Sequence, residues 1–132
     1  MTSEGSSRFV VAVVDDDHRT LESLANLLEA AGYDVRQYSS ASMVWKPGVL
    51  SEIDLLISDI GMPGMDGIEL RRLTLLERPE LPVILITGRP EVRAQYSSII
   101  ERDRYFEKPF DGQELLAAIR RVLDGARPKP ER

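Results

Sequence analysis

The stretch "FVVAVVDDD", residues 9–17, decides the fold because an unbroken apolar run ends abruptly in three carboxylates. A continuous run of valines and other apolar residues is typical of a strand buried on both faces of a parallel sheet. Adjacent carboxylates repel one another and hold protons more tightly than usual unless a positive charge lies nearby. The stretch therefore predicts a central strand whose carboxyl end faces a cation.

Further short runs on either side of this stretch also have strand character. Those at 54–58 ("DLLIS") and 82–87 ("PVILIT") are almost wholly apolar, as buried central strands are. Those at 33–38 ("YDVRQY") and 104–107 ("RYFE") are mixed, as edge strands usually are. We therefore expect a sheet with buried central strands and two more exposed edges.

Helical patterns alternate with the strands. Apolar residues recur at helical spacing in four segments, at 18–31, 66–77, 90–101 and 111–124. The segment 40–53 is weaker because Pro47 and Gly48 interrupt any helix there. Five strand–helix units in succession predict an α/β fold, with a parallel sheet covered by helices on both faces.

Length and composition indicate an ordinary globular domain. The chain has 132 residues, of which 42% are hydrophobic and 30% are charged, with a net charge of −5 and no cysteine. The negative charge argues against a direct nucleic-acid partner, and the lack of cysteine excludes disulfides and thiolate chemistry. No apolar run approaches the roughly 18 residues of a membrane span, so we expect no membrane association.

The domain boundaries follow from the ends of the pattern. We expect a disordered N-terminal lead at 1–8, a single domain over 9–124, and a flexible tail or linker stub at 125–132. The lead is small and polar, without the apolar segment of a signal peptide. Together with the absence of cysteine, this fits a cytoplasmic protein.

Polar residues fall at the predicted strand exits. Asp15, Asp16 and Asp17 follow the first strand, and three further exits carry Asp59, Thr87 and Lys108. In open α/β sheets ligands bind beyond the carboxyl ends of the strands, so these side chains should meet at one edge. Carboxylate oxygens suit Mg²⁺, and a metal beside an ammonium favours phosphoryl chemistry with a carboxylate nucleophile.

Each of these residues also has an ordinary structural role to weigh. Asp17 is as well explained by a helix N-cap as by a ligand site, and Asp59 alone suits a turn. A lone Thr87 suits a sheet edge, and a lone Lys108 suits solvent. The site hypothesis therefore rests on the convergence of complementary groups from four strand ends.

The motifs at these exits, taken together, resemble the receiver domain of two-component response regulators. They are "VVDDD", "DLLISDIGMPGMDGIEL", "VILITG" and "YFEKPF", in that order from about Phe9 to Leu123. The resemblance implies a flavodoxin-like (βα)5 three-layer sandwich with a five-stranded parallel sheet in the order 2-1-3-4-5. It departs before the fifth strand, where "IIERDRYF" replaces the usual Gly-Ala pair.

The resemblance also implies roles for individual residues. Asp59 would accept the phosphoryl group, and Lys108 would contact it. Asp15, Asp16, Asp59 and the backbone carbonyl of Gly61 would hold Mg²⁺. Thr87 and Tyr105 would act as switch residues. Pro109 occupies the position of the family's cis-proline, and X–Pro is where cis bonds are tolerated.

As a receiver domain, the chain would act as a phosphoacceptor signalling domain, with weak self-phosphorylation and autodephosphorylation only. Its donor would be a sensor histidine kinase or phosphotransfer protein. Phosphorylation would shift the face of the fourth helix, fifth strand and fifth helix toward a downstream protein or output domain. A phosphorylation-linked homodimer is a further expectation.

Two other functions fit parts of the pattern. A receiver-like adaptor that works without phosphate would explain the unusual approach to the fifth strand. A haloacid-dehalogenase-type phosphatase also uses an aspartyl phosphate, Mg²⁺, a hydroxyl and a lysine. Its Asp-x-Asp-x-Thr/Val motif fails here, because Arg19 stands at the last position of "DDDHR".

Overall fold

The computed structural model describes residues 8–62, 64–89 and 104–124. The helix predicted over 90–101 and the tail predicted at 125–132 lie outside the described residues. So does the N-terminal lead, apart from Arg8.

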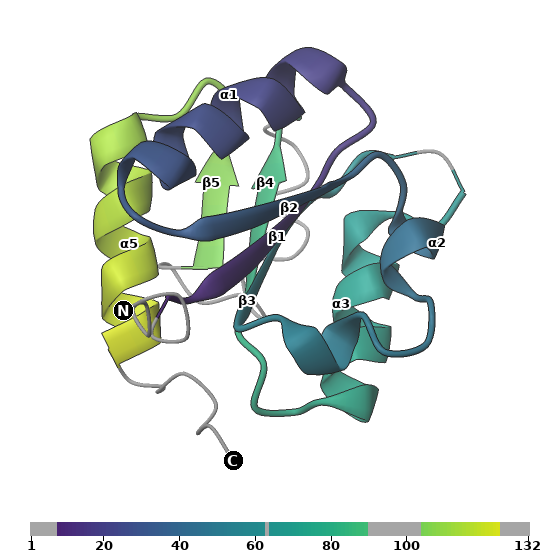
Figure 1. Cartoon of the computed structure of the whole chain (residues 1–132). Coiled ribbons are helices and arrows are strands. Elements are labelled where there is room, and N and C mark those ends of the chain that lie inside the picture. Colours follow the sequence, from purple (N-terminus) through teal and green to yellow (C-terminus); the bar gives the residue numbers. More distant parts are fainter. Residues whose placement is uncertain (1–7, 63, 90–103, 125–132) are drawn as a thin grey trace.

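A five-stranded parallel sheet forms the centre of the domain, in the order β2-β1-β3-β4-β5. Its strands are β1 (Val10–Val14), β2 (Asp34–Tyr38), β3 (Leu55–Asp59), β4 (Val83–Thr87) and β5 (Tyr105–Glu107). The three apolar runs form the central strands and the two mixed runs form the edges, as predicted (Figure 1). The predicted α/β fold and strand order are confirmed.

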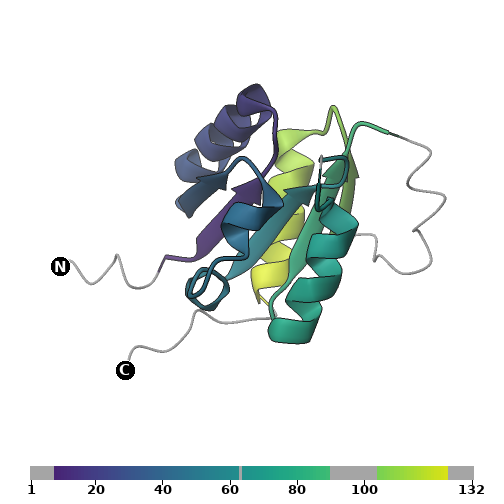
Figure 2. The ribbon, with the colours of Figure 1, turned by 90° about the vertical axis from the view of Figure 1, so that its right-hand side faces the viewer.

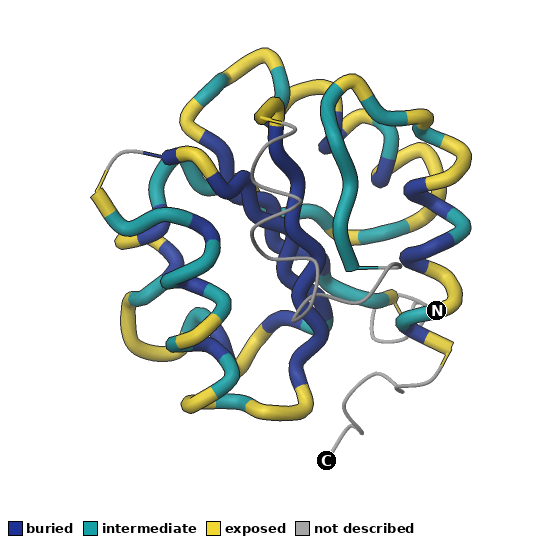
Figure 3. Tube along the Cα trace, turned by 180° about the vertical axis from the view of Figure 1, so that it is seen from behind, coloured by how far each residue is buried: buried dark blue, intermediate teal, exposed yellow. Residues whose placement is uncertain are grey.

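Helices cover both faces of the sheet. They are α1 (His18–Ala30), the short α2 (Ala41–Val44), α3 (Gly67–Glu77) and α5 (Gly112–Asp124), with a 3₁₀ turn at Leu50–Glu52. One apolar cluster joins the sheet to α1 and α5, and a second joins it to α2 and α3. Figure 1 shows α1 and α5 on one side of the sheet and α2 and α3 on the other, and Figure 2 looks onto the sheet from the side of α2 and α3. The buried residues concentrate along the central strands (Figure 3).

The pleat of β3 divides its side chains between these clusters. Leu55 and Ile57 belong to the cluster under α1 and α5, whereas Leu56 and Ile60 belong to the cluster under α2 and α3. Successive side chains of a strand point to opposite faces, so Ser58 lies on the α3 side. The strand is buried throughout.

One helical segment, α3, differs from the predicted pattern, and the weak segment at 40–53 follows it. In α3 the buried residues are Gly67, Leu70 and Thr74, whereas Leu76 is 72% exposed. The apolar stripe predicted for this segment is therefore only partly buried, because the face of α3 that packs on the sheet is formed by Gly67, Leu70 and Thr74. In the weak segment 40–53, α2 ends at Val44, before Pro47 and a Gly48 with φ of 87°.

Within the described residues, no helix is both long enough and apolar enough to cross a membrane.

Candidate functional site

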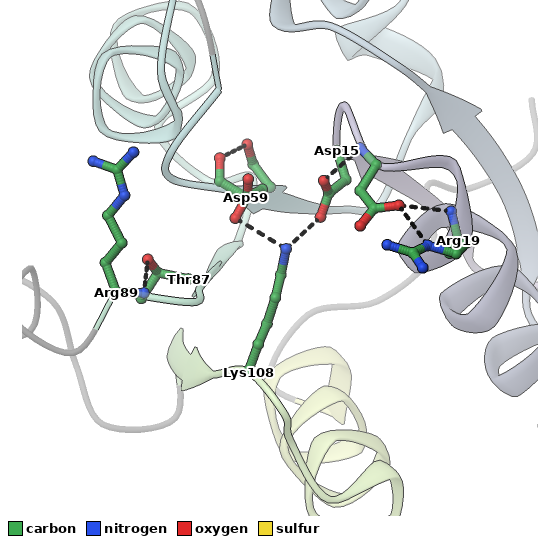
Figure 4. A network of polar contacts seen from close by, with 8 residues as sticks. Asp15, Arg19, Asp59, Thr87, Arg89 and Lys108 are labelled. Atoms are coloured by element: carbon green, nitrogen blue, oxygen red, sulfur yellow. Dashed lines mark hydrogen bonds and ion pairs between the residues drawn. The ribbon is translucent and has the colours of Figure 1, made fainter.

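Three of the predicted side chains meet at the carboxyl edge of the sheet. The Lys108 Nζ lies 2.9 Å from Asp15 Oδ2 and 3.3 Å from Asp59 Oδ1 (Figure 4). The lysine thus bridges carboxylates from the exits of β1 and β3. The positive charge that the run of acids requires is supplied, in part, by this side chain.

The backbone holds each of these groups in place. Asp59 is the last residue of β3, and Asp15 directly follows β1 and is fully buried. The backbone N–H of Asp17 donates to Asp15 Oδ1 at 2.9 Å, which leaves Oδ2 to accept from Lys108. The backbone N–H of Lys108 donates to the carbonyl of Thr87 at 2.7 Å, so the lysine is attached to the end of β4.

The acidic residues at this edge suit a hard cation. One carboxylate oxygen from each of Asp15, Asp16 and Asp59 lies within 4.8 Å of the others. Asp16 is exposed, whereas Asp15 and Asp59 are buried, so the cluster opens to solvent on one side. Oxygen ligands with room for water match the preference of Mg²⁺. Gly61, predicted to add a carbonyl ligand, is exposed two residues beyond Asp59.

Electrostatics at the site reflect crowding of like charges. Burial raises the pKa of Asp59, and the neighbouring charge of Asp15 raises it further, against the opposing effect of Lys108. Burial alone would lower the pKa of Lys108, but its hydrogen bond to Asp15 and the charge of Asp59 raise it. The lysine therefore stays charged, while the acidic cluster is left with excess negative charge.

Asp17, the third aspartate of the run, caps helix α1. Asp17 is the N-cap of α1, and its carboxylate accepts a hydrogen bond from the backbone N–H of Arg19 at 2.9 Å. That hydrogen bond lowers the pKa of Asp17. The acidic cluster found among the described residues does not include Asp17, so the capping interpretation is the correct one.

The predicted switch residues lie on the neighbouring strands β4 and β5. Thr87 ends β4 and is buried, and its Oγ1 accepts a hydrogen bond from the backbone N–H of Arg89 at 3.0 Å (Figure 4). Tyr105 begins β5, is half-buried, and packs against the apolar cluster under α2 and α3. The bond between Lys108 and Pro109 is cis, as the resemblance implied.

The loop after Asp59 turns back tightly into α3. Asp66 caps α3 by accepting a hydrogen bond from the backbone N–H of Glu69 at 2.9 Å. The backbone N–H of Gly67 donates to the carbonyl of Ile60 at 3.0 Å. A Cβ at Gly67 would overlap the carbonyl oxygen of Asp59 and lie 2.9 Å from the Ile60 Cα, so only glycine fits this close approach.

One residue at the site does not stand out in the sequence patterns. Ser58, just before Asp59, is fully buried, and its Oγ donates to the carbonyl oxygen of Asp59 at 3.0 Å. The available signal is a single hydroxyl in an otherwise apolar strand. Such a signal marks a buried polar group but not its partner.

A family comparison agrees with this geometry. Residues 11–120 match the family model described as the response regulator receiver domain. The chain belongs to this family. It is therefore a receiver domain of two-component response regulators, a family of phosphorelay signalling domains rather than conventional enzymes.

Relatives of this receiver domain include longer regulators. It is 35% identical over 114 residues to the transcriptional regulatory protein FixJ of Azorhizobium caulinodans, covering 86% of this chain and 54% of the relative. It is 34% identical over 115 residues to the response regulator protein TodT of Pseudomonas putida, covering 86% and 51%. The chain spans about half the length of these relatives.

Solved structures support the same fold. The signal receiver domain of an HD domain-containing protein from Pseudomonas fluorescens superposes with a TM-score of 0.79 at 32% identity. The match covers 90% of this receiver domain and 89% of that chain. The response regulator StyR superposes with a TM-score of 0.73 at 35% identity, covering 89% and 60%.

Proposed function

We propose that this receiver domain accepts a phosphoryl group on Asp59. The observation that carries the proposal is the bridging of Asp15 and Asp59 by Lys108, at 2.9 Å and 3.3 Å, beside the exposed Asp16. The ammonium of Lys108 lies between the two carboxylates, so it can contact a group bound to Asp59 while Asp15 holds it in place. Thr87, predicted to contact the phosphoryl group, ends the neighbouring strand β4.

In the proposed reaction, a carboxylate oxygen of Asp59 forms a bond to phosphorus as the bond between phosphorus and the donor breaks. With a phosphohistidine donor, the leaving imidazole nitrogen takes a proton from solvent. Lys108 neutralises charge on the phosphoryl oxygens during the transfer. The chain accelerates its own phosphorylation and dephosphorylation only weakly, consistent with a signalling role.

The predicted Mg²⁺ would be held by Asp15, Asp16, Asp59 and the Gly61 carbonyl. Bound there, it would supply charge neutralisation and orientation for the transferring oxygens. Asp16 is the most accessible of these carboxylates, because Asp15 and Asp59 are buried. Asp15, which is bonded to Lys108 and to the Asp17 N–H, keeps the lysine beside Asp59.

The proposed switch starts from the phosphoryl group on Asp59. The new group adds charge and acceptor oxygens at the edge of the sheet. Thr87 then hydrogen-bonds to it, and Tyr105 on the neighbouring strand moves into the space that Thr87 leaves. This biases two existing packings of the face that includes β5 and α5, and so changes its affinity for a partner.

The proposed donor is a sensor histidine kinase or a phosphotransfer protein. The proposed receiver of the signal is a downstream protein or an output domain, or a second phosphorylated copy. The ion pairs of Lys108 favour phosphorylation-dependent signalling over an adaptor that binds without phosphate. An adaptor would have no need to hold an ammonium between two buried carboxylates.

The proposal is tested by intact mass after incubation with acetyl phosphate, with and without Mg²⁺, followed by size measurement. We expect the mass of one phosphoryl group to be added only with Mg²⁺, and not to Asp59→Asn. Equal labelling of Asp59→Asn would show that the acceptor is another residue. A change in size on phosphorylation would reveal the homodimer.

A further inference from the structure

Ser58 is a buried polar residue that the proposed reaction does not use. It lies in β3 on the side of α3, where its strand neighbours Leu56 and Ile60 belong to an apolar cluster. Its exposed fraction is 0%. A hydroxyl in apolar surroundings is costly unless it is hydrogen-bonded, so its partner is informative.

The partner of Ser58 is the backbone of the proposed acceptor. The Ser58 Oγ donates to the carbonyl oxygen of Asp59 at 3.0 Å. Nothing in the secondary structure requires this bond, because the strand ladder is built from backbone groups. A buried strand favours apolar side chains, so neither the strand nor the apolar cluster explains the hydroxyl.

The same carbonyl is confined from a second direction. The start of α3 packs so closely on it that a Cβ at Gly67 would overlap the Asp59 carbonyl oxygen. The Gly67 N–H also donates to the carbonyl of Ile60, the next residue, at 3.0 Å. The peptide group that follows the proposed acceptor is thus held by a hydroxyl and by the backbone of α3.

We propose that Ser58 is a positioning residue for phosphoryl transfer, acting through the backbone of Asp59. Its hydrogen bond fixes the carbonyl, and with it the Cα from which the carboxylate extends toward Lys108. The N–H end of the same peptide group is held by β4, because the Ile60 N–H donates to the carbonyl of Ile86 at 2.8 Å. The Ser58 hydroxyl acts on its other end, the Asp59 carbonyl oxygen. Small misplacements of reacting groups lower reaction rates. The hydrogen bond of Ser58 can therefore affect the rate of phosphoryl transfer although Ser58 does not touch the phosphoryl group.

This inference rests on the proposed function, and its test separates the two. The rate of phosphoryl uptake from acetyl phosphate is measured by intact mass for wild type, Ser58→Ala and Thr74→Val. The measurement uses saturating Mg²⁺ and a temperature well below the thermal unfolding midpoint of each protein. Thr74 provides the control. Its hydroxyl is also fully buried, on α3, and makes no hydrogen bond within the part of the chain that the structure describes.

We expect Ser58→Ala to take up the group about three- to tenfold more slowly, as the net free energy of one hydrogen bond allows. Thr74→Val should match wild type, because it removes a hydroxyl that has no bond to lose. Wild-type uptake by Ser58→Ala would overturn this inference alone, whereas an inert wild type would overturn the proposed function with it.

Discussion

The ammonium of Lys108 and the buried carboxylate of Asp15 form an ion pair of 2.9 Å across 93 residues of sequence. The contact of Lys108 with Asp59, the proposed acceptor, is longer at 3.3 Å. The lysine is therefore held between a fixed structural acid and the acid proposed to react. The ion pair with Asp15 positions the lysine, and the second contact leaves it available to a group on Asp59.

Replacing Lys108 by methionine should destabilise the metal-free protein. Two buried carboxylates would lose their compensating charge, which costs roughly 2–4 kcal/mol of unfolding free energy. Urea unfolding at pH 7 in a chelator measures the loss, and added Mg²⁺ should recover part of it.

Arg72→Met is the matched control for this loss. Arg72 pairs with Glu69 at 2.7 Å, a shorter contact, but both side chains are largely exposed. Exposed pairs contribute little because solvent screens them, so the control should change the unfolding free energy much less than Lys108→Met does. Equal losses in the two variants would contradict the importance given to burial.

Asp59→Asn should stabilise the metal-free protein at neutral pH. The folded-state pKa of Asp59 is raised, chiefly by burial and then by Asp15. Protonated Asp59 therefore favours the folded state, and this contribution is fully present below the unfolded-state pKa of about 3.9. The contribution is lost as the pH rises through the higher folded-state pKa. Asparagine avoids the charged form, so its advantage should be largest at pH 7 and shrink toward acid.

The measurement is the urea unfolding midpoint of Asp59→Asn and of wild type, taken in a chelator from pH 7 down to acid pH. Saturating Mg²⁺ should reverse the order of stability, because the variant lacks one proposed ligand. A variant that is less stable than wild type at pH 7 without metal would be inconsistent with the crowded acidic cluster.

Asp16 and Asp17 should separate metal binding from helix capping. Asp17→Ala removes the N-cap of α1 and should lower the unfolding free energy while leaving Mg²⁺ affinity unchanged. Asp16→Ala should show the opposite result, with weak Mg²⁺ binding and little change in stability.

Calorimetric Mg²⁺ titration and urea unfolding of both variants check this division. The two residues are adjacent and chemically identical, so each is the control for the other. If Asp17→Ala weakened Mg²⁺ binding as much as Asp16→Ala, the acidic cluster would have been assigned to the wrong residues.

Sequence patterns predict the convergence at this site well, because the carboxyl ends of parallel strands must share an edge. Asp15, Asp59, Thr87 and Lys108 lie where the strand exits place them. Sequence patterns do not predict which roles Asp15, Asp16 and Asp17 each have. Three identical side chains in a row can be told apart only by the turn that aims one inward, one to solvent and one at the helix.

Two other features depend on contacts that no periodicity reports. Leu76 fits the apolar stripe of α3 by residue type, yet it is 72% exposed. The helix is rotated so that Gly67, Leu70 and Thr74 are buried instead. Ser58 is a serine in an apolar strand, and its importance appears only with its hydrogen bond to Asp59. In both cases the deciding quantity is helix rotation or side-chain direction, which the three-dimensional packing sets.

The central claim is that Asp59 carries the phosphoryl group, and chemical mapping of that group tests it most directly. After phosphorylation with acetyl phosphate and Mg²⁺, borohydride reduces an aspartyl phosphate to homoserine, which peptide mass spectrometry locates. We predict homoserine at position 59 alone. Homoserine at position 15 or 16 instead, or at no position in a protein that has gained the phosphoryl mass, would contradict the account.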